Sequence, residues 1–202
     1  LYVLDELKKL PQNPWKNQKI EALTQIITQC LGLYVSAESS RPYVTPKDEV
    51  MAKVEVTNRS HKTLLLNRVY SDQLYFFENT QPQSIHALAS RYVESLEAPL
   101  KSIDLSTPYW LKNQATSGRF EVSNRALIGA ALGPESVSVN LDFSLEGHEF
   151  TVKTPLRYKY RDRVQGEVFD PFVVLPALTL SSSEAVMVFN DQKPKSLNIT
   201  LT

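Results

Sequence analysis

The sequence predicts a mainly β protein, an antiparallel β-sandwich that follows a short N-terminal helical hairpin. Apolar residues recur every three or four positions before Gly32, which is the spacing of one helical face. From Leu33 onward the apolar spacing becomes two, as in half-buried strands. The apolar segments after Leu33 are separated by turn residues rather than by helical stretches, and a parallel sheet would need such helices.

Two helices are predicted before residue 33. The first has leucine at positions 1, 4, 7 and 10, and Pro11 ends it. For the second, Asn13 is the expected N-cap and Gly32 the expected end. We expect Trp15 to anchor this helix on its neighbour and Cys30 to be a small buried apolar residue. The apolar stripe of the second helix consists of Ile20, Leu23, Ile26, Ile27, Cys30 and Leu31.

The strands are predicted from alternation and from turn residues. Residues 33–37 and 50–57 alternate, and Asn58-Arg59-Ser60-His61 turns the chain into 62–70, which resembles the opening of an immunoglobulin-like domain. Residues 136–145 and 150–160 are predicted to form a hairpin around Glu146-Gly147-His148. Further strands are expected at 74–77, 91–97 and 119–122, and shorter ones at 172–180, 185–189 and 197–201.

Three segments follow from these elements. Residues 1–32 are a helical connection to an upstream domain, and 33–175 are an immunoglobulin-like antiparallel β-sandwich. Residues 176–202 are trailing strands or the start of a following β domain. A helix pair this short does not bury two apolar stripes against itself, so we expect the chain to be a piece of a larger protein.

Composition argues against several function classes. The 22 basic and 22 acidic residues cancel, so we expect no nucleic-acid partner. No apolar run reaches the roughly 20 residues of a membrane-spanning helix, so we expect no membrane insertion. The three histidines lie far apart and the motifs of nucleophilic enzymes are missing, so we expect no metal, no cofactor and no catalytic residue. A distant acid/base pair such as Asp142 and Glu167 is left open.

Four aromatic residues are candidates for carbohydrate binding. Tyr109 and Trp110 follow Pro108, and such a pair stacks on a sugar ring if it is exposed or packs in the core if it is not. Tyr158 and Tyr160 alternate with basic residues, so they share one face of a strand, with a solvated cationic row on the other. A sugar-binding role requires exposed, coplanar rings.

Five segments of the sequence resemble the C-terminal part of large bacterial PIG-L/LmbE-like deacetylases. These are Pro14-Trp15-Lys16, Cys30-Leu31-Gly32-Leu33, the segment 54–60, Pro108-Tyr109-Trp110-Leu111, and the segment from Tyr158 to Val168. The resemblance implies a zinc-dependent N-acetylglucosaminyl deacetylase domain upstream, followed by β-sandwich modules related to sugars or the cell envelope. It also implies a periplasmic or cell-surface location. The family's His-Pro-Asp-Asp motif is absent here, so no catalytic residue carries over.

The sequence therefore supports two hypotheses of function. In the first, the chain is a non-catalytic accessory or scaffold module of a deacetylase that acts on cell-envelope or extracellular glycans. An exposed apolar face on the helix of residues 1–10 would favour this hypothesis, because a self-sufficient domain covers such a face. In the second, the chain is a carbohydrate-binding module that uses Tyr109, Trp110, Tyr158 and Tyr160.

Overall fold

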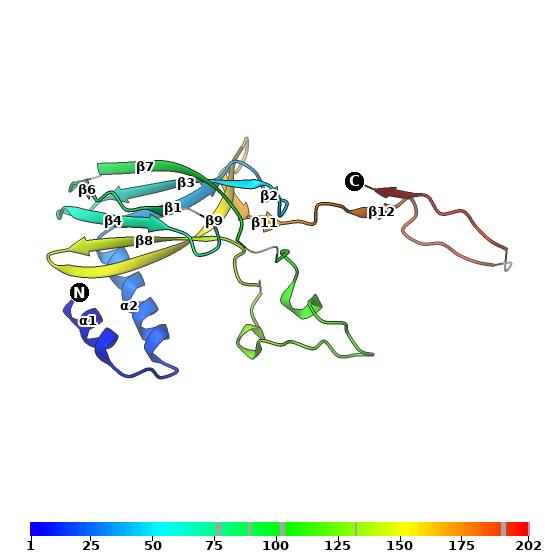
Figure 1. Ribbon diagram of the computed structural model, residues 1–202, viewed down its shortest axis with the longest axis horizontal. Coiled ribbons are helices and arrows are strands. Elements are labelled where there is room, and N and C mark those ends of the chain that lie inside the picture. The colour runs from blue at the N-terminus through cyan, green and yellow to red at the C-terminus, as the bar shows by residue number, and fades with distance from the viewer. Residues whose placement is uncertain (76–77, 89, 102–103, 132, 191–192, 202) are drawn as a thin grey trace.

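A computed structural model describes residues 1–202 except 76–77, 89, 102–103, 132, 191–192 and 202, and the side chains of 90 and 91 (Figure 1). Two α-helices, α1 (Tyr2–Lys9) and α2 (Lys16–Cys30), precede the strands, and two 3-10 turns, η1 (Tyr109–Leu111) and η2 (Arg125–Leu127), lie between β7 and β8. The strands are β1 (Leu33–Ser39), β2 (Tyr43–Val44), β3 (Glu49–Asn58), β4 (Leu64–Tyr70), β5 (Glu78–Asn79), β6 (Gln83–Ile85), β7 (Ser90–Pro99), β8 (Ser138–Leu145), β9 (His148–Asp162), β10 (Gly166–Pro171), β11 (Val173–Val174), β12 (Leu180–Ser182) and β13 (Ile199–Leu201).

The main sheet is one curled layer. Within the described residues its strand order is β5-β4-β8-β9-β1-β3-β7, with β10 paired to β9 and β6 paired to β4. Neighbours in this sheet are antiparallel except β1 and β9, which run parallel over Ala37–Ser39 and Leu156–Tyr158. The curl makes the sheet a half-barrel, and Figure 1 shows the helices beneath it and the ribbon β12–β13 projecting away from it.

The prediction of a mainly β fold behind two helices is confirmed, while an immunoglobulin-like sandwich is not. The reason lies in β9, which is 15 residues long. Its first half pairs with β8 and its second half pairs with β1 and β10. Because one strand joins both halves by backbone hydrogen bonds, the strands form one continuous curled sheet rather than two stacked ones.

The core lies inside the curl and follows the predicted alternation. On β3, Val50, Ala52, Val54 and Val56 are each 0% exposed, whereas the residues between them face outward. Burying each of the three valine side chains contributes roughly 1.5–3 kcal/mol. On the opposite side, the Phe143 and Phe150 rings stack with centroids 5.5 Å apart. These two rings come from the two strands of the predicted hairpin.

That hairpin, β8–β9, is present as expected. Glu146 and Gly147 both have positive φ, at 52° and 85°, which is the geometry of a two-residue type I′ turn. The strand predicted at 119–122 is wrong. Arg119 forms an isolated bridge with Thr116, and residues 120–122 are not part of a strand. At 74–77, Leu74 forms only a bridge with Leu100, and residues 76–77 lie outside the described part of the chain.

Both helices form as predicted. Asn13 accepts hydrogen bonds from the Trp15 and Lys16 backbone N–H groups at 3.0 Å, so it caps the start of α2. Gly32 ends the helical segment with a φ of +56°. The α1 helix docks on the β8–β9 hairpin, where Leu4 is 1% exposed and the Asp5 carboxylate lies 2.6 Å from Nδ1 of His148. The apolar stripe of α1 is therefore covered at Leu4, whereas Leu1 and Leu7 are half-buried and Leu10 is 48% exposed.

Two predictions for the helices are wrong. Trp15 is 67% exposed, because it lies directly before the first residue of α2 rather than along the stripe that packs on the core. Cys30 is exposed as well. It shares the outer side of α2 with Ile26, which is 54% exposed, while Ile27 is buried at 9%. The buried stripe of α2 is thus narrower than the apolar pattern suggested.

None of the helices in the described ranges is long and apolar enough to cross a membrane.

Candidate functional site

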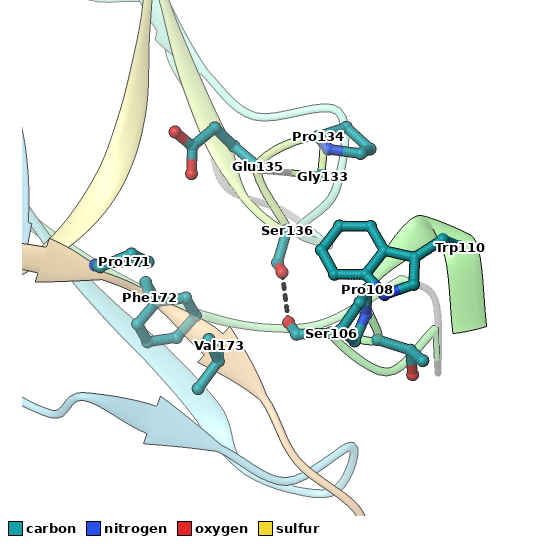
Figure 2. A pocket seen from close by; sticks show the side chains of 11 residues that line it. Ser106, Pro108, Trp110, Gly133, Pro134, Glu135, Ser136, Pro171, Phe172 and Val173 are labelled. Atoms are coloured by element: carbon teal, nitrogen blue, oxygen red, sulfur yellow. Dashed lines mark hydrogen bonds between the residues drawn. The ribbon is translucent and has the colours of Figure 1, made fainter. Parts of the chain in front are cut away.

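A small pocket lies where three distant segments meet, namely residues 106–110, 133–136 and 171–173 (Figure 2). Its volume is about 190 Å³. Trp110 and Pro108 stand on one side, and Phe172 and Val173 on the other. Phe172 is 2% exposed, so its ring belongs to the core, while Glu135 sits at the rim 3.9 Å from Arg157. The pocket therefore combines aromatic walls with a charged rim.

Ser106 fixes the base of this pocket. Its hydroxyl lies 2.5 Å from the Ser136 hydroxyl, as Figure 2 shows, and accepts the Val174 backbone N–H at 2.8 Å. The Ser106 backbone N–H in turn donates to the Val174 carbonyl at 2.9 Å. These bonds hold both ends of the long loop of residues 101–135 against β11. This arrangement was not predictable from the sequence, because the two serines lie 30 positions apart.

Tyr109 and Trp110 come together on η1, but not as a flat platform. Their ring centroids are 4.9 Å apart and the ring planes meet at 89°. The Tyr109 hydroxyl donates to the Ala130 carbonyl at 3.1 Å, which connects η1 to the later part of the same loop. Only Trp110 lines the pocket. The coplanar surface that a two-ring sugar platform requires is therefore missing at this pair.

Tyr158 and Tyr160 stack on each other rather than lying side by side in one plane. They lie on the same face of β9, as predicted, with ring centroids 5.2 Å apart and planes inclined by only 19°. Tyr160 is 37% exposed and Tyr158 is half-buried. Loss of water contact and the nearby Asp170 raise the pKa of Tyr160, so its hydroxyl stays protonated and able to donate at neutral pH. Each ring therefore covers one face of the other, so this pair is not the coplanar platform either, and Tyr160 is its exposed ring.

The basic row on the other face of β9 differs from the prediction at Lys159. This residue was expected to be solvated, but its ammonium lies 3.1 Å from both Glu38 and Glu167. The Glu38 side chain is only 8% exposed and also accepts a hydrogen bond from Ser36. Partial burial alone would lower the pKa of Lys159, but the bonds to the two carboxylates outweigh burial and raise it.

Sequence reasoning missed Glu38, and the reason is positional. Glu38 stands at an outward position of β1, where a glutamate normally meets water. The parallel pairing of β1 with β9 places it beside Lys159, 121 positions later in the chain. The two carboxylates left open as an acid/base pair have separate partners: Asp142 accepts from the Thr151 hydroxyl and Glu167 pairs with Lys159.

The histidines also lie apart. His148 contacts Asp5, and no group of three or more His, Cys, Asp or Glu side chains suited to a metal ion occurs in the part of the chain that the structure describes.

Comparison with known proteins identifies no family. No protein-family model matches the chain, and no curated protein matches it. Among solved structures, it is similar to the Pseudomonas fluorescens alkylpurine DNA glycosylase AlkC bound to DNA containing an abasic site analogue, at 10% sequence identity. That match covers 77% of this chain and 42% of the glycosylase chain, with a TM-score of 0.29. A TM-score this low does not indicate a shared fold, and nothing about function follows from it.

Proposed function

We propose that this chain is a non-catalytic accessory module that packs on a second folded domain through its C-terminal ribbon, β12–β13. The observation that supports this proposal is the exposure of the ribbon's apolar side chains. Large apolar residues of this segment are between 46% and 77% exposed: Leu178, Leu180, Val186, Val188, Phe189, Leu197, Ile199 and Leu201.

The ribbon is amphipathic. Its register pairs Leu180 with Leu201 and Ser182 with Ile199, so the three apolar residues share one face. Ser181 and Thr200 pair on the opposite face, which is polar. A two-stranded ribbon is marginally stable in water by itself, and exposed contiguous apolar surface marks interaction sites. One apolar face on a projecting ribbon therefore fits an element that is completed by a partner.

The partner domain that we propose is the PIG-L/LmbE-like deacetylase domain implied by the sequence resemblance. In this role the chain would position a catalytic domain that removes acetyl groups from N-acetylglucosaminyl glycans in the periplasm or at the cell surface. The resemblance also implies a β-sandwich module. The curled, mostly antiparallel sheet supports that part of the proposal only as far as a β fold.

The test uses substitutions on one face of the ribbon. Leu180→Ser, Ile199→Ser and Leu201→Ser together remove the apolar face, and Ser181→Ala with Thr200→Ala is the matched control on the polar face. Association with a separately produced PIG-L/LmbE-like deacetylase domain is measured by calorimetry. We expect at least about a tenfold loss for the triple variant, or about 1.4 kcal/mol, and none for the control. Equal affinities would exclude the ribbon as the docking element, and no association of the unaltered chain would exclude this partner.

A second candidate function is carbohydrate binding, for which the 37% exposed ring of Tyr160 is the supporting observation. Aromatic faces stack on the apolar faces of sugar rings, and the pocket beside Trp110 offers a further aromatic wall. Chitohexaose, a polymer of N-acetylglucosamine, is the probe for calorimetry. Binding that is lost in Tyr160→Ala and kept in Tyr43→Ala, a substitution at an exposed tyrosine on β2, would support this function. Absence of binding by the folded chain would reject it for this sugar.

A further inference from the structure

A groove of about 520 Å³ runs between α2 and the first half of β9. One wall is a stripe of α2 that extends from Asn17 to Gln29 and is polar except at Ile20. The other wall is formed by residues 151–153 of β9. This groove is separate from the pocket beside Trp110 and from the C-terminal ribbon.

The β9 wall is an open strand edge. Residues 148–155 of β9 pair with β8, but pairing with β1 on the other edge begins only at Leu156. In an antiparallel pair, alternate residues direct their N–H and C=O groups toward the partner and the rest direct theirs away. The Leu156 N–H donates to the carbonyl of Val137, the residue just before β8. The backbone N–H and C=O groups of the even-numbered residues of β9 therefore point toward β8. The backbone N–H and C=O groups of the odd-numbered residues 149, 151 and 153 therefore point to the other edge, toward the helices.

An independent contact agrees with this orientation. The Glu149 carbonyl accepts a hydrogen bond of 2.6 Å from Nζ of Lys8 on α1. The first outward carbonyl of the edge is thus capped by a helix side chain. For the next two residues, Thr151 and Lys153, no backbone hydrogen bond is formed on this side with any described residue. Both residues line the groove.

The helix wall does not satisfy these groups either. The hydroxyls of Thr24 and Thr28 donate to the helix's own carbonyls, at 2.9 and 2.8 Å. The backbone of α2 is already bonded within the helix. Glu21, Gln25 and Gln29 also line this wall. Backbone groups left unpaired on a strand edge are a template for another strand.

We propose that this groove binds an extended peptide segment, which adds to the edge of β9 as a short antiparallel or parallel strand. The peptide backbone would bond the N–H and C=O groups of Thr151 and Lys153, as in other cases of β-strand addition. The amides of Gln25 and Gln29 suit hydrogen bonds to a peptide backbone, and Glu21 with Lys153 selects polar side chains over apolar ones on the groove side. The edge from Thr151 to Pro155 is about 13 Å long at about 3.3 Å per residue, which suits a segment of four to six residues.

The first measurement is amide hydrogen exchange of the whole chain without a ligand. The amides of Thr151 and Lys153 should exchange at least about tenfold faster than those of Val152 and Thr154, which face β8. Equal protection of all four amides would mean that the edge is already covered, and it would overturn the proposal.

The second measurement adds a library of acetylated hexapeptides in which polar and apolar residues alternate. Peptides that bind should slow exchange at Thr151 and Lys153. Backbone N-methylation of a bound peptide should weaken it about fivefold to tenfold, because each methyl group removes one hydrogen-bond donor. A library in which no peptide protects these two amides would overturn the proposal, as would an N-methylated peptide that binds equally well.

A pair of variants isolates the backbone from the side chain. Lys153→Pro removes the outward N–H, and Lys153→Ala removes only the side chain. Peptide affinity should fall about fivefold to tenfold in the proline variant and change less than about twofold in the alanine variant. If the proline variant does not fold, the N-methylated peptides test the same hydrogen bonds on the unaltered chain. Protection of the two amides by chitohexaose but not by peptides would assign the groove to carbohydrate and reject the peptide.

Discussion

At the scale of single residues, Asn58 shows how one buried polar side chain can join three segments. It is 0% exposed, and its amide nitrogen donates to the carbonyls of Lys62, Ile85 and His86 at 2.7–3.0 Å. Its amide oxygen accepts from the backbone and hydroxyl of Ser60. The side chain thus connects the β3–β4 turn to the end of β6. A turn role was expected from sequence, but the long-range bonds to residues 85 and 86 were not.

Asn58→Asp should destabilise the fold strongly. The substitution keeps the shape of the side chain but places a carboxylate oxygen against three carbonyl oxygens, and it leaves those carbonyls without their donor. Leaving buried groups unsatisfied costs about 1–3 kcal/mol each, so we expect a loss of about 3 kcal/mol or more in the free energy of unfolding in urea. Ser60→Ala, the neighbouring control, should cost about 1 kcal/mol. Equal losses in the two variants would contradict this role for Asn58.

At the scale of elements, α1 is held on the sheet by a few contacts at the β8–β9 hairpin. Leu4 inserts into the core, Asp5 contacts His148, and the Lys8 ammonium donates a hydrogen bond to the Glu149 carbonyl. The hydrogen bond from His148 holds the pKa of Asp5 below its ordinary value of 3.8. A carboxylate with a lowered folded pKa stabilises the fold above its ordinary pKa, and that contribution is lost as the pH falls through the folded value.

Asp5→Asn should therefore loosen α1 in a pH-dependent way. At pH 6 the amides of α1 should exchange faster in this variant than in the unaltered chain. The difference should shrink as the pH falls below 3.8, because the unaltered Asp5 then becomes protonated too. Hydrogen exchange read by mass spectrometry measures both. Glu6→Gln, on the same helix but paired only with Lys9 at the surface, should not show this pH dependence. A pH-independent difference for Asp5→Asn would contradict the assignment.

At the scale of the whole molecule, side chains and short bridges close the open side of the half-barrel. β5 and β7 are the two ends of the strand order, and the Asn79 amide on β5 donates to Glu94 on β7 at 2.6 Å. The Tyr92 hydroxyl donates to the same carboxylate. Burial, the hydrogen bond to Glu94 and its negative charge raise the pKa of Tyr92 well above its ordinary value of 10.0. We call this contact between β5 and β7, formed by Asn79, Tyr92 and Glu94, the seam. Its hydrogen bonds depend on a protonated tyrosine.

The protein should accordingly lose stability at alkaline pH through this seam. A group with a raised folded pKa contributes fully below its ordinary pKa, and the contribution is lost as the pH rises toward the folded value. The urea midpoint should fall above pH 10, and this fall should be smaller in Tyr92→Phe, which has no hydroxyl to ionise. Tyr43→Phe, at an exposed position, should keep the fall of the unaltered chain. Identical alkaline profiles for both variants would show that Tyr92 does not control the seam.

Local signals in the sequence determined the elements of this protein. The leucine spacing before Pro11, the cap at Asn13, the alternation of β3 and the Glu146-Gly147 turn each lie within a few neighbouring residues, and each formed as predicted. The stacking of Tyr158 on Tyr160 was also predictable as a shared face, because side chains two apart on a strand lie on one side. Which helix faces are buried was not predictable, as Trp15 and Cys30 demonstrate.

Tertiary structure alone decided how the strands join and where the polar groups meet. The parallel pairing of β1 with β9 turns an expected two-sheet sandwich into one curled sheet, brings Glu38 to Lys159, and leaves the β9 edge open beside α2. The pocket beside Trp110 likewise needs residues 106, 136 and 172 together. These contacts span tens to more than a hundred positions, and their partners are fixed by the packing of the whole sheet. Periodicity reports which way a side chain points along its own strand, but it carries no information on which strand lies beside it.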